Sequence, residues 1–180
     1  MKATVREFIA SDIEKIVAYF MDAEKDYLKG MGADKSKLPN REKWTQNLQS
    51  ELAKPYKEKS NYYIIWLIDN TPVGHSNVNH ISFGASANMH LHLWKSDTRK
   101  SGLGLEFLKM TIPLYFEKFE LKKLICEPYA ENIAPNKTLK KLGFDFIRTY
   151  ETIPGMINFQ QNVNRYELTK VHLDEIIKDL

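Results

Sequence analysis

Cysteine is almost absent from this chain of 180 residues, which contains only Cys126, inside an apolar segment. A disulfide framework is therefore excluded, and a reducing compartment is indicated. An excess of one charge is also lacking, because 26 basic residues face 23 acidic ones and leave a formal net charge of +3. This near balance gives no electrostatic reason to expect nucleic-acid or membrane binding.

Long hydrophobic runs are missing as well. No apolar stretch approaches membrane-spanning length, and Met1 runs into a strand-like segment without the apolar core of a signal peptide. We therefore expect a cytoplasmic protein that binds neither nucleic acid nor membranes. With 43% hydrophobic residues, the chain is long enough for one domain with a substantial core and too short for two of usual size. Residues 1–180 are predicted to form that single domain.

Hydrophobic periodicity and turn signals predict alternating strands and helices. The predicted strands are residues 4–8, 62–68, 73–81, 88–95, 123–126, 145–152 and 162–168. The predicted helices are residues 11–27, 41–54, 102–119, 132–142 and 171–180. The first helix opens with a capping box from Ser11 to Glu14. Pro113 should kink or shorten its helix, and Gly30, Gly32 and Pro39 make residues 29–40 a mobile connection.

Two neighbouring predicted strands carry polar side chains with a period of two residues. His75, Asn77 and Asn79 share one face of the first, and His90 and His92 share a face of the second together with Trp94. Met89, Leu91 and Leu93 form the opposite face of the second strand. The pattern predicts that one face of this pair belongs to the core and the other forms the polar wall of a cleft.

A glycine-containing segment joins the strand at residues 88–95 to the helix at 102–119. It reads Arg99-Lys100-Ser101-Gly102-Leu103-Gly104. The first N–H groups of a helix lack partners within the helix and favour an anion, and glycine lets a phosphate approach the backbone. Phe107 stands where a dinucleotide-binding loop would have its third glycine, and no P-loop Lys-Ser/Thr follows. The segment is therefore predicted to hold a pyrophosphate of another kind.

The order of these elements resembles the GNAT acyltransferase superfamily over essentially the whole chain, and two motifs support the resemblance. Residues 99–104 are similar to the family's Arg/Gln-x-x-Gly-x-Gly/Ala loop for the coenzyme A pyrophosphate. Glu131-Asn132-Ile133-Ala134, followed by Lys140-Lys141-Leu142-Gly143-Phe144, is similar to the family's second motif. Val5-Arg6 and Asp12 resemble the branch of ribosomal-protein and small-molecule N-acetyltransferases.

The resemblance implies an α/β (α+β) fold with a mixed, mostly antiparallel sheet of about seven strands, helices on both faces and a splay between strands 4 and 5. It implies that acetyl-CoA lies in this splay. Backbone groups near Leu93 and Trp94 would then pair with the pantetheine arm, and an N–H there would polarise the thioester. The implied coenzyme contacts are Leu93, Trp94, Arg99, Lys100, Ser101, Gly102, Leu103, Gly104, Asn132 and Asn136.

The catalytic groups depart from the family pattern. The fourth strand carries no carboxylate as general base, so His90 or His92 is the candidate base. Leu139 replaces the tyrosine that protonates the leaving thiolate in many members, which leaves Tyr129, Asn136 and Tyr150 as alternatives. The three histidines at 75, 90 and 92 could instead bind zinc, although no carboxylate or cysteine accompanies them at ligand spacing, and no metal is expected.

These features predict an N-acetyltransferase that moves an acetyl group from acetyl-CoA to a primary amine, either a protein N-terminus or a small molecule. The alternative is an acyl-CoA-binding sensor without turnover. The lysines between residues 25 and 59 either form a solvated face or bind an anion, which would be the ribose phosphate of the coenzyme or an acidic acceptor. Residues 29–40 and 152–162 are expected to select the acceptor. The last hairpin could pair across a homodimer.

Overall fold

The computed structural model describes residues 2–94 and 102–178. The strands are β1 (Ala3–Glu7), β2 (Asn61–Ile68), β3 (Thr71–Ser82), β4 (Ser86–Leu93), β5 (Lys123–Cys126), β6 (Asp145–Thr152) and β7 (Gln161–Thr169). The α-helices are α1 (Ile13–Met21), α2 (Lys25–Gly30), α3 (Arg41–Ala53), α4 (Leu103–Lys118), α5 (Ile133–Lys141) and α6 (Lys170–Lys178). None of these helices combines the length and the apolar character needed to cross a membrane.

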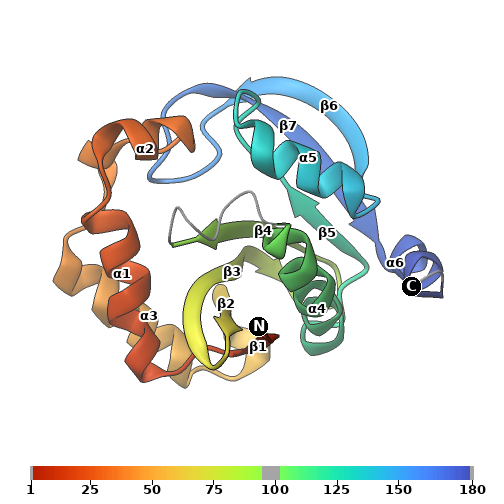
Figure 1. The fold of residues 1–180 in the computed structure, drawn as a ribbon, viewed down its shortest axis with the longest axis horizontal. Coiled ribbons are helices and arrows are strands. Elements are labelled where there is room, and N and C mark those ends of the chain that lie inside the picture. The colour runs from red at the N-terminus through yellow and green to blue at the C-terminus, as the bar shows by residue number, and fades with distance from the viewer. Residues whose placement is uncertain (1, 95–101, 179–180) are drawn as a thin grey trace.

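The strands form one seven-stranded sheet in the order β1-β2-β3-β4-β5-β7-β6 (Figure 1). The pairing of β4 with β5 is parallel, and every other neighbouring pair is antiparallel. The expected mixed, mostly antiparallel α/β fold is therefore confirmed.

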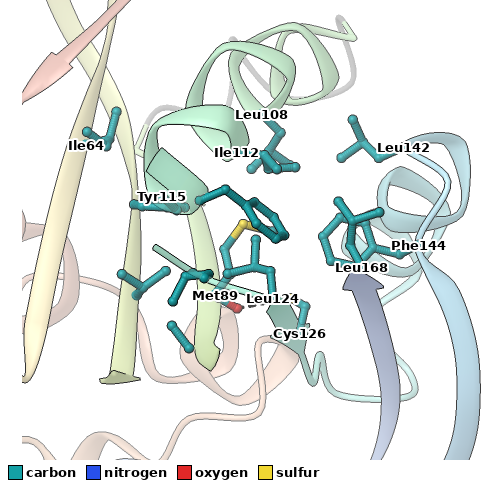
Figure 2. Close-up of a cluster of buried hydrophobic side chains, with 14 of the residues drawn as sticks. Ile64, Met89, Leu108, Ile112, Tyr115, Leu124, Cys126, Leu142, Phe144 and Leu168 are labelled. Carbon is teal, nitrogen blue, oxygen red and sulfur yellow. Dashed lines mark hydrogen bonds between the residues drawn. The ribbon is translucent and has the colours of Figure 1, made fainter. Parts of the chain in front are cut away.

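A continuous apolar core lies between the sheet and α4, α5 and α6. Trp66 of β2 stacks on Phe107 of α4 with ring centroids 5.1 Å apart, and its indole N–H donates to Thr111 Oγ1 at 2.9 Å. Figure 2 shows how side chains from both halves of the sheet meet below α4, among them Met89 of β4 and Leu168 of β7. This single core therefore links both halves of the sheet.

A second core covers only the half of the sheet formed by β1 to β4. Its buried side chains come from β2, α1, α3 and the segment after β1, and are Phe8, Ile13, Ile16, Val17, Leu48, Tyr63, Ile65 and Leu67. Burial of such side chains stabilises the fold by roughly 1.5–3 kcal/mol each. Helices α1 and α3 therefore lie on the face opposite α4.

The sheet opens between β4 and β5. Their pairing covers Ser86↔Lys123, Ala87↔Leu124 and Asn88↔Ile125, and it stops there although β4 continues to Leu93. The predicted splay between the fourth and fifth strands is thus present. Helix α4 begins beside the far end of β4, at the mouth of the gap (Figure 1).

The start of the first helix differs from the prediction. Asp12, not Ser11, organises it: its carboxylate accepts from the Ile9 N–H at 3.0 Å and from both terminal nitrogens of Arg6 at 2.6 and 2.9 Å. Burial alone would raise the pKa of Asp12, but these hydrogen bonds outweigh burial and lower it. The helix also ends at Met21 rather than Tyr27, because the chain turns and starts α2 at Lys25.

Pro113 does not break or shorten α4, which runs from Leu103 to Lys118. The missing N–H and the ring of an interior proline cost about 3 kcal/mol. Thr111, Ile112 and Tyr115 are buried around it, so the packing of α4 on the sheet offsets this cost. Tertiary burial here overrides a local rule that the sequence states clearly.

The predicted mobile connection at residues 29–40 is instead tied to the segment between β6 and β7. Ala33 pairs with Asn158, and the N–H of Asp34 donates to the Ile157 carbonyl at 2.7 Å. The Gly32 carbonyl accepts from the side-chain amides of Asn158 and Gln161 at 2.8 and 2.7 Å. The two segments expected to select the acceptor therefore form one joined structure.

Gly74 sits where β3 passes closest to its neighbours, and replacing it with alanine should be costly. A Cβ there would stand 2.5 Å from the His92 carbonyl oxygen and 3.2 Å from Leu93 Cα, both backbone atoms. Such overpacking costs about 1–3 kcal/mol. We expect Gly74→Ala to lower the free energy of unfolding by that amount in urea titrations.

Gly30→Ala is the matched control for that substitution. A Cβ at Gly30, the last residue of α2, meets no atom within 4 Å, and its φ is not positive. Alanine there should stabilise the protein by about 0.4–1 kcal/mol. Equal effects of the two substitutions would contradict the close packing of β3 on β4.

Candidate functional site

The N-terminus of α4 has the backbone that the glycine segment predicted. Gly102 is the N-cap residue with φ 82°, a left-handed conformation, and a Cβ there would meet no atom of the described residues within 4 Å. Glycine adopts this conformation without the strain that a side chain brings. The first N–H groups of α4 therefore begin at an open backbone position suited to an anion. Arg99, Lys100 and Ser101 lie outside the described residues.

The backbone of β4 faces the gap at alternate residues. Trp94 N–H donates to the Val73 carbonyl on β3 at 2.9 Å, whereas the Met89 carbonyl accepts from the Cys126 thiol on the β5 side at 3.0 Å. Because backbone groups in a strand alternate in direction, those of Leu91 and Leu93 point to the side of the gap. The Trp94 N–H therefore belongs to the ladder with β3, while the backbone of Leu93, the other predicted coenzyme contact at this strand end, faces the gap.

Leu93 also marks how close α4 comes to β4. A Cβ at Gly104 would lie 3.9 Å from Leu93 Cδ1, which is ordinary van der Waals contact. The contact places the first turn of α4 against the end of β4.

His90 lies beside the gap, on the strand face opposite α4. Its Nε2 is 3.1 Å from Asn79 Oδ1, so the neutral ring carries its proton on Nε2 and has its lone pair on Nδ1. Burial, followed by the charge of His80, lowers the pKa of His90 to about 4, although the carboxylate of Glu127 opposes the shift. Glu127 directly follows β5, so it lies on the other side of the gap, close enough for its charge to act on the imidazole of His90.

His92 and His75 form a different, enclosed pair. Their ring centroids are 4.8 Å apart, and the Trp94 indole N–H donates to His75 Nδ1 at 2.8 Å. His75 is fully buried rather than part of a wet cleft wall, which corrects the prediction for that residue. Burial lowers the pKa of His75 to about 3 and holds the pKa of His92 well below its usual value.

Trp94 lines a cavity of about 340 Å³ at the end of β4. Tyr19 of α1 and Tyr27 of α2 form its aromatic walls, with Lys15 and Asp22 at the same cavity. The hydrogen bond from the Trp94 indole to His75 fixes the orientation of the indole at this cavity. The cavity offers a largely aromatic surface next to the strand end.

Sequence reasoning missed the polar cluster on the other side of the gap. Tyr150 of β6 donates its hydroxyl hydrogen to Glu127 Oε1 at 2.6 Å, and Arg165 of β7 donates to the same oxygen at 2.9 Å. Arg165 also binds Glu167, which pairs with Lys123 of β5. The signal in the sequence was the carboxylate of Glu127 immediately after the fifth strand. Its position across the gap from His90, however, depends on the splay of the two strands.

Asn132 and Asn136 have structural roles at the start of α5. Asn132 occupies the expected N-cap position, but its side chain makes no capping hydrogen bond. Asn136 donates to the carbonyls of Tyr129 and Asn132 at 3.0 and 2.7 Å and accepts from Asn164 at 2.8 Å. The Asn136 amide is thus engaged by protein groups and joins α5 to β7.

Zinc was an alternative role for the three histidines. Within residues 2–94 and 102–178, no group of three or more His, Cys, Asp or Glu side chains is arranged to hold a metal ion. His75 and His92 lie against each other, while His90 turns to Asn79.

The buried imidazoles should make stability depend on pH. His75, His90 and His92 stay neutral in the folded protein below pH 6.5, whereas the unfolded chain takes up protons there. The free energy of unfolding should therefore fall as the pH decreases from 6.5 to 5, by up to about 1.4 kcal/mol per pH unit for each imidazole. Carboxylates with lowered pKa values, such as Asp12, lose stabilisation only nearer pH 4.

Urea titrations at pH 7, 6 and 5 measure this dependence. His92→Phe keeps an aromatic ring in place and removes one of the three titrating groups, so its dependence on pH should be weaker. If the free energy of unfolding of this variant changed with pH as steeply as that of the unaltered protein, His92 would titrate in the folded protein as it does in the unfolded chain.

The fold of this chain recurs in solved acetyltransferases. Aminoglycoside acetyltransferase AAC(6')-Ib in complex with coenzyme A matches with a TM-score of 0.74 at 14% identity, over 97% of this chain and 98% of that one. The ribosomal-protein acetyltransferase RimL in complex with coenzyme A gives 0.77 at 13% identity, over 96% of each chain. Spermidine N-acetyltransferase from Vibrio cholerae, in complex with coenzyme A and spermine, gives 0.77 at 12% identity, over 95% and 97%.

The sequence itself matches one known family over most of its length. No curated protein matches the chain. The acetyltransferase (GNAT) domain matches residues 2–145, which include the splayed strands, the start of α4 and all of α5. The chain therefore belongs to the GNAT acetyltransferase family.

Proposed function

We propose that this protein is an acetyl-CoA-dependent N-acetyltransferase that acetylates a primary amine by direct attack. The observation that carries the proposal is the gap between β4 and β5, with the left-handed Gly102 and the N-terminus of α4 at its mouth. An extended chain with a pyrophosphate at one end fits such a gap, since the strand edge pairs with the chain and the helix N-terminus binds the phosphates.

The chain's own backbone would hold the coenzyme. The N–H groups of Gly102, Leu103 and Gly104 would receive the pyrophosphate, with Arg99, Lys100 and Ser101 contributing as the motif implies. The backbone groups of Leu91 and Leu93, which point to the gap, would pair with the pantetheine arm and polarise the thioester carbonyl. When bound, acetyl-CoA supplies the activated acetyl group, and the protein supplies orientation and proton acceptance.

His90 is the general base that the electrostatics favour over His92. An ammonium must lose a proton before its nitrogen can attack, and the neutral His90 has its lone pair on Nδ1. A pKa of about 4 makes this imidazole a weak base, but Glu127 across the gap stabilises its protonated form. Within the described residues, the charges that act on His92 are those of His75 and His90, and both lower its pKa further.

Two tyrosines remain candidates for protonating the leaving thiolate. Burial, with Glu127 next, raises the pKa of Tyr150, and a hydrogen bond with Glu131 raises that of Tyr129. Both hydroxyl groups therefore keep their protons at neutral pH. Tyr150 already contacts Glu127, the residue opposite His90, which favours it as a donor in the same network.

An acyl-CoA sensor without turnover is the second candidate function. The weakly basic, buried imidazoles at positions 90 and 92 favour it, because neither is tuned near neutral pH. The two candidates share coenzyme binding and differ only in acetyl transfer.

Coenzyme binding is tested by Gly102→Asp. A carboxylate at the N-cap of α4 would repel a pyrophosphate and stand in its place, so we expect acetyl-CoA binding to fall at least about 100-fold in calorimetry. Gly84→Asp is the matched control, because Gly84 has a similar φ of 75° and equally open space, but lies in the turn between β3 and β4. Equal losses in both variants would point to backbone strain instead of the proposed site.

Base catalysis is tested by His90→Ala with His92→Ala as its comparison. We expect His90→Ala to lower kcat by about 100-fold, the low end of the usual contribution of a general base, and to remove the acidic limb of the pH profile. Glu127→Gln should shift that limb to lower pH, because the imidazolium loses the carboxylate that stabilises it and the pKa of His90 falls. Both His variants should retain coenzyme binding.

Thiol release with a panel of amines measures these effects. If neither histidine substitution changes turnover or its pH profile, imidazole base catalysis is excluded. If acetyl-CoA binds and no amine in a broad panel is acetylated, the sensor is favoured.

A further inference from the structure

A second cavity, of about 650 Å³, lies between α2, the turn at Lys35–Lys37 and the segment that joins β6 to β7. Three lysines line it, Lys25, Lys29 and Lys35, together with Asp34 and Phe159. We call this cavity the lysine pocket. Its volume lies in the range of pockets that bind small ligands or short peptide segments.

The charges of the lysine pocket are not balanced within the protein. Asp34 supplies the only carboxylate among the residues that line it, and that carboxylate accepts from the N–H and the hydroxyl of Ser36. Among the described residues, no hydrogen bond or ion pair engages the Lys29 ammonium. Lys25 and Lys29 are four residues apart on the short helix α2, where like charges repel. A bound anion would remove this repulsion.

The walls of the pocket are built by long-range contacts. Gly32 has a φ of 84°, and a Cβ there would collide with Gln161 at 2.1 Å, so residues 29–40 pack closely on the segment before β7. The Lys37 ammonium also donates to the Asn158 carbonyl at 2.8 Å. These contacts fix the backbone around the pocket before any ligand arrives, which lowers the entropic cost of binding.

The lysine pocket adjoins the proposed transfer site on two sides. Phe159 packs against the ring of Tyr129, whose carbonyl is held by Asn136 next to α5. Helix α2 separates the lysine pocket from the aromatic cavity at the end of β4, since Tyr27 lines that cavity while Lys25 and Lys29 line the pocket. An acceptor must therefore reach past α2 for its amine to lie at the end of β4 while its other groups contact the lysines.

We propose that the lysine pocket selects the acceptor, and that the acceptor is an amine with anionic groups close to it. This inference rests on the proposed N-acetyltransferase function. Carboxylates after the N-terminal residue of an acidic peptide, or the phosphate of a small amine, have the same chemistry and would pair with the same lysines. Polycationic amines, such as the spermine bound to the structurally similar Vibrio cholerae enzyme, would be repelled.

The test compares three tetrapeptides that share an N-terminal serine and continue with three aspartates, three serines or three lysines. Thiol release from acetyl-CoA gives kcat/KM for each, and calorimetry in the presence of coenzyme A gives binding without turnover. We expect the aspartyl peptide to exceed the lysyl peptide by at least about tenfold, and salt to narrow the difference. Phosphoethanolamine serves as the small anionic amine. A higher kcat/KM for phosphoethanolamine than for the aspartyl peptide would identify the acceptor as a small molecule.

The double variant Lys25→Glu with Lys29→Glu should invert the order of the aspartyl and lysyl peptides. Lys2→Glu with Lys122→Glu is the matched control, because it changes two exposed lysines elsewhere by the same charge. Equal use and equal binding of the peptides by the unaltered protein would overturn the inference, as would an unchanged order in the double variant.

Two further outcomes separate this inference from the proposed function. Weaker coenzyme A binding in the Lys25→Glu, Lys29→Glu variant, with an unchanged peptide order, would assign the lysines to the ribose phosphate and overturn the acceptor role. Loss of all acetyl-CoA binding and transfer in the unaltered protein would contradict the proposed function itself. Acetyl transfer without any preference for the charge of the acceptor would be consistent with the proposed function and would overturn only the inference about the acceptor.

Discussion

The site depends on the point at which β4 and β5 stop pairing. Beyond Asn88↔Ile125 the two strands separate, and β4 carries its backbone onward to Leu93 with one edge turned to the gap. Backbone groups deprived of a ladder partner need another one, as the thiol of Cys126 provides for Met89. His90 on β4 and Glu127 directly after β5 lie on the two sides of this separation.

The two cores explain why the sheet stays folded although β4 and β5 separate. The core below α4 contains Met89 of β4, Leu124 of β5 and Tyr166 of β7, so it joins both halves of the sheet on one face. Within the described residues, the buried strand side chains of the core below α1 and α3 come from β2 and not from β5, β6 or β7. The core below α4 therefore holds the two halves together next to the gap.

Buried polar groups near the gap carry a cost that the sequence pattern alone does not show. His75 Nε2 and His92 Nδ1 are buried with no hydrogen-bond partner in the described part of the chain. A buried polar atom without a hydrogen bond lowers stability relative to one that has a partner. Burial also keeps both imidazoles neutral. Natural proteins often accept such costs at functional sites, which agrees with the position of this pair at the end of β4.

Local periodicity and turn chemistry by themselves determined most of the elements, from the buried strand β2 to the left-handed Gly143 after α5, because neighbouring residues decide these features. The glycine segment before α4 also predicted the helix N-terminus correctly. Only the tertiary structure decided that α4 continues through Pro113, that Gly32 packs on Gln161, and that Glu127 lies across the gap from His90. Those outcomes depend on burial and on contacts between distant segments, which no local pattern encodes.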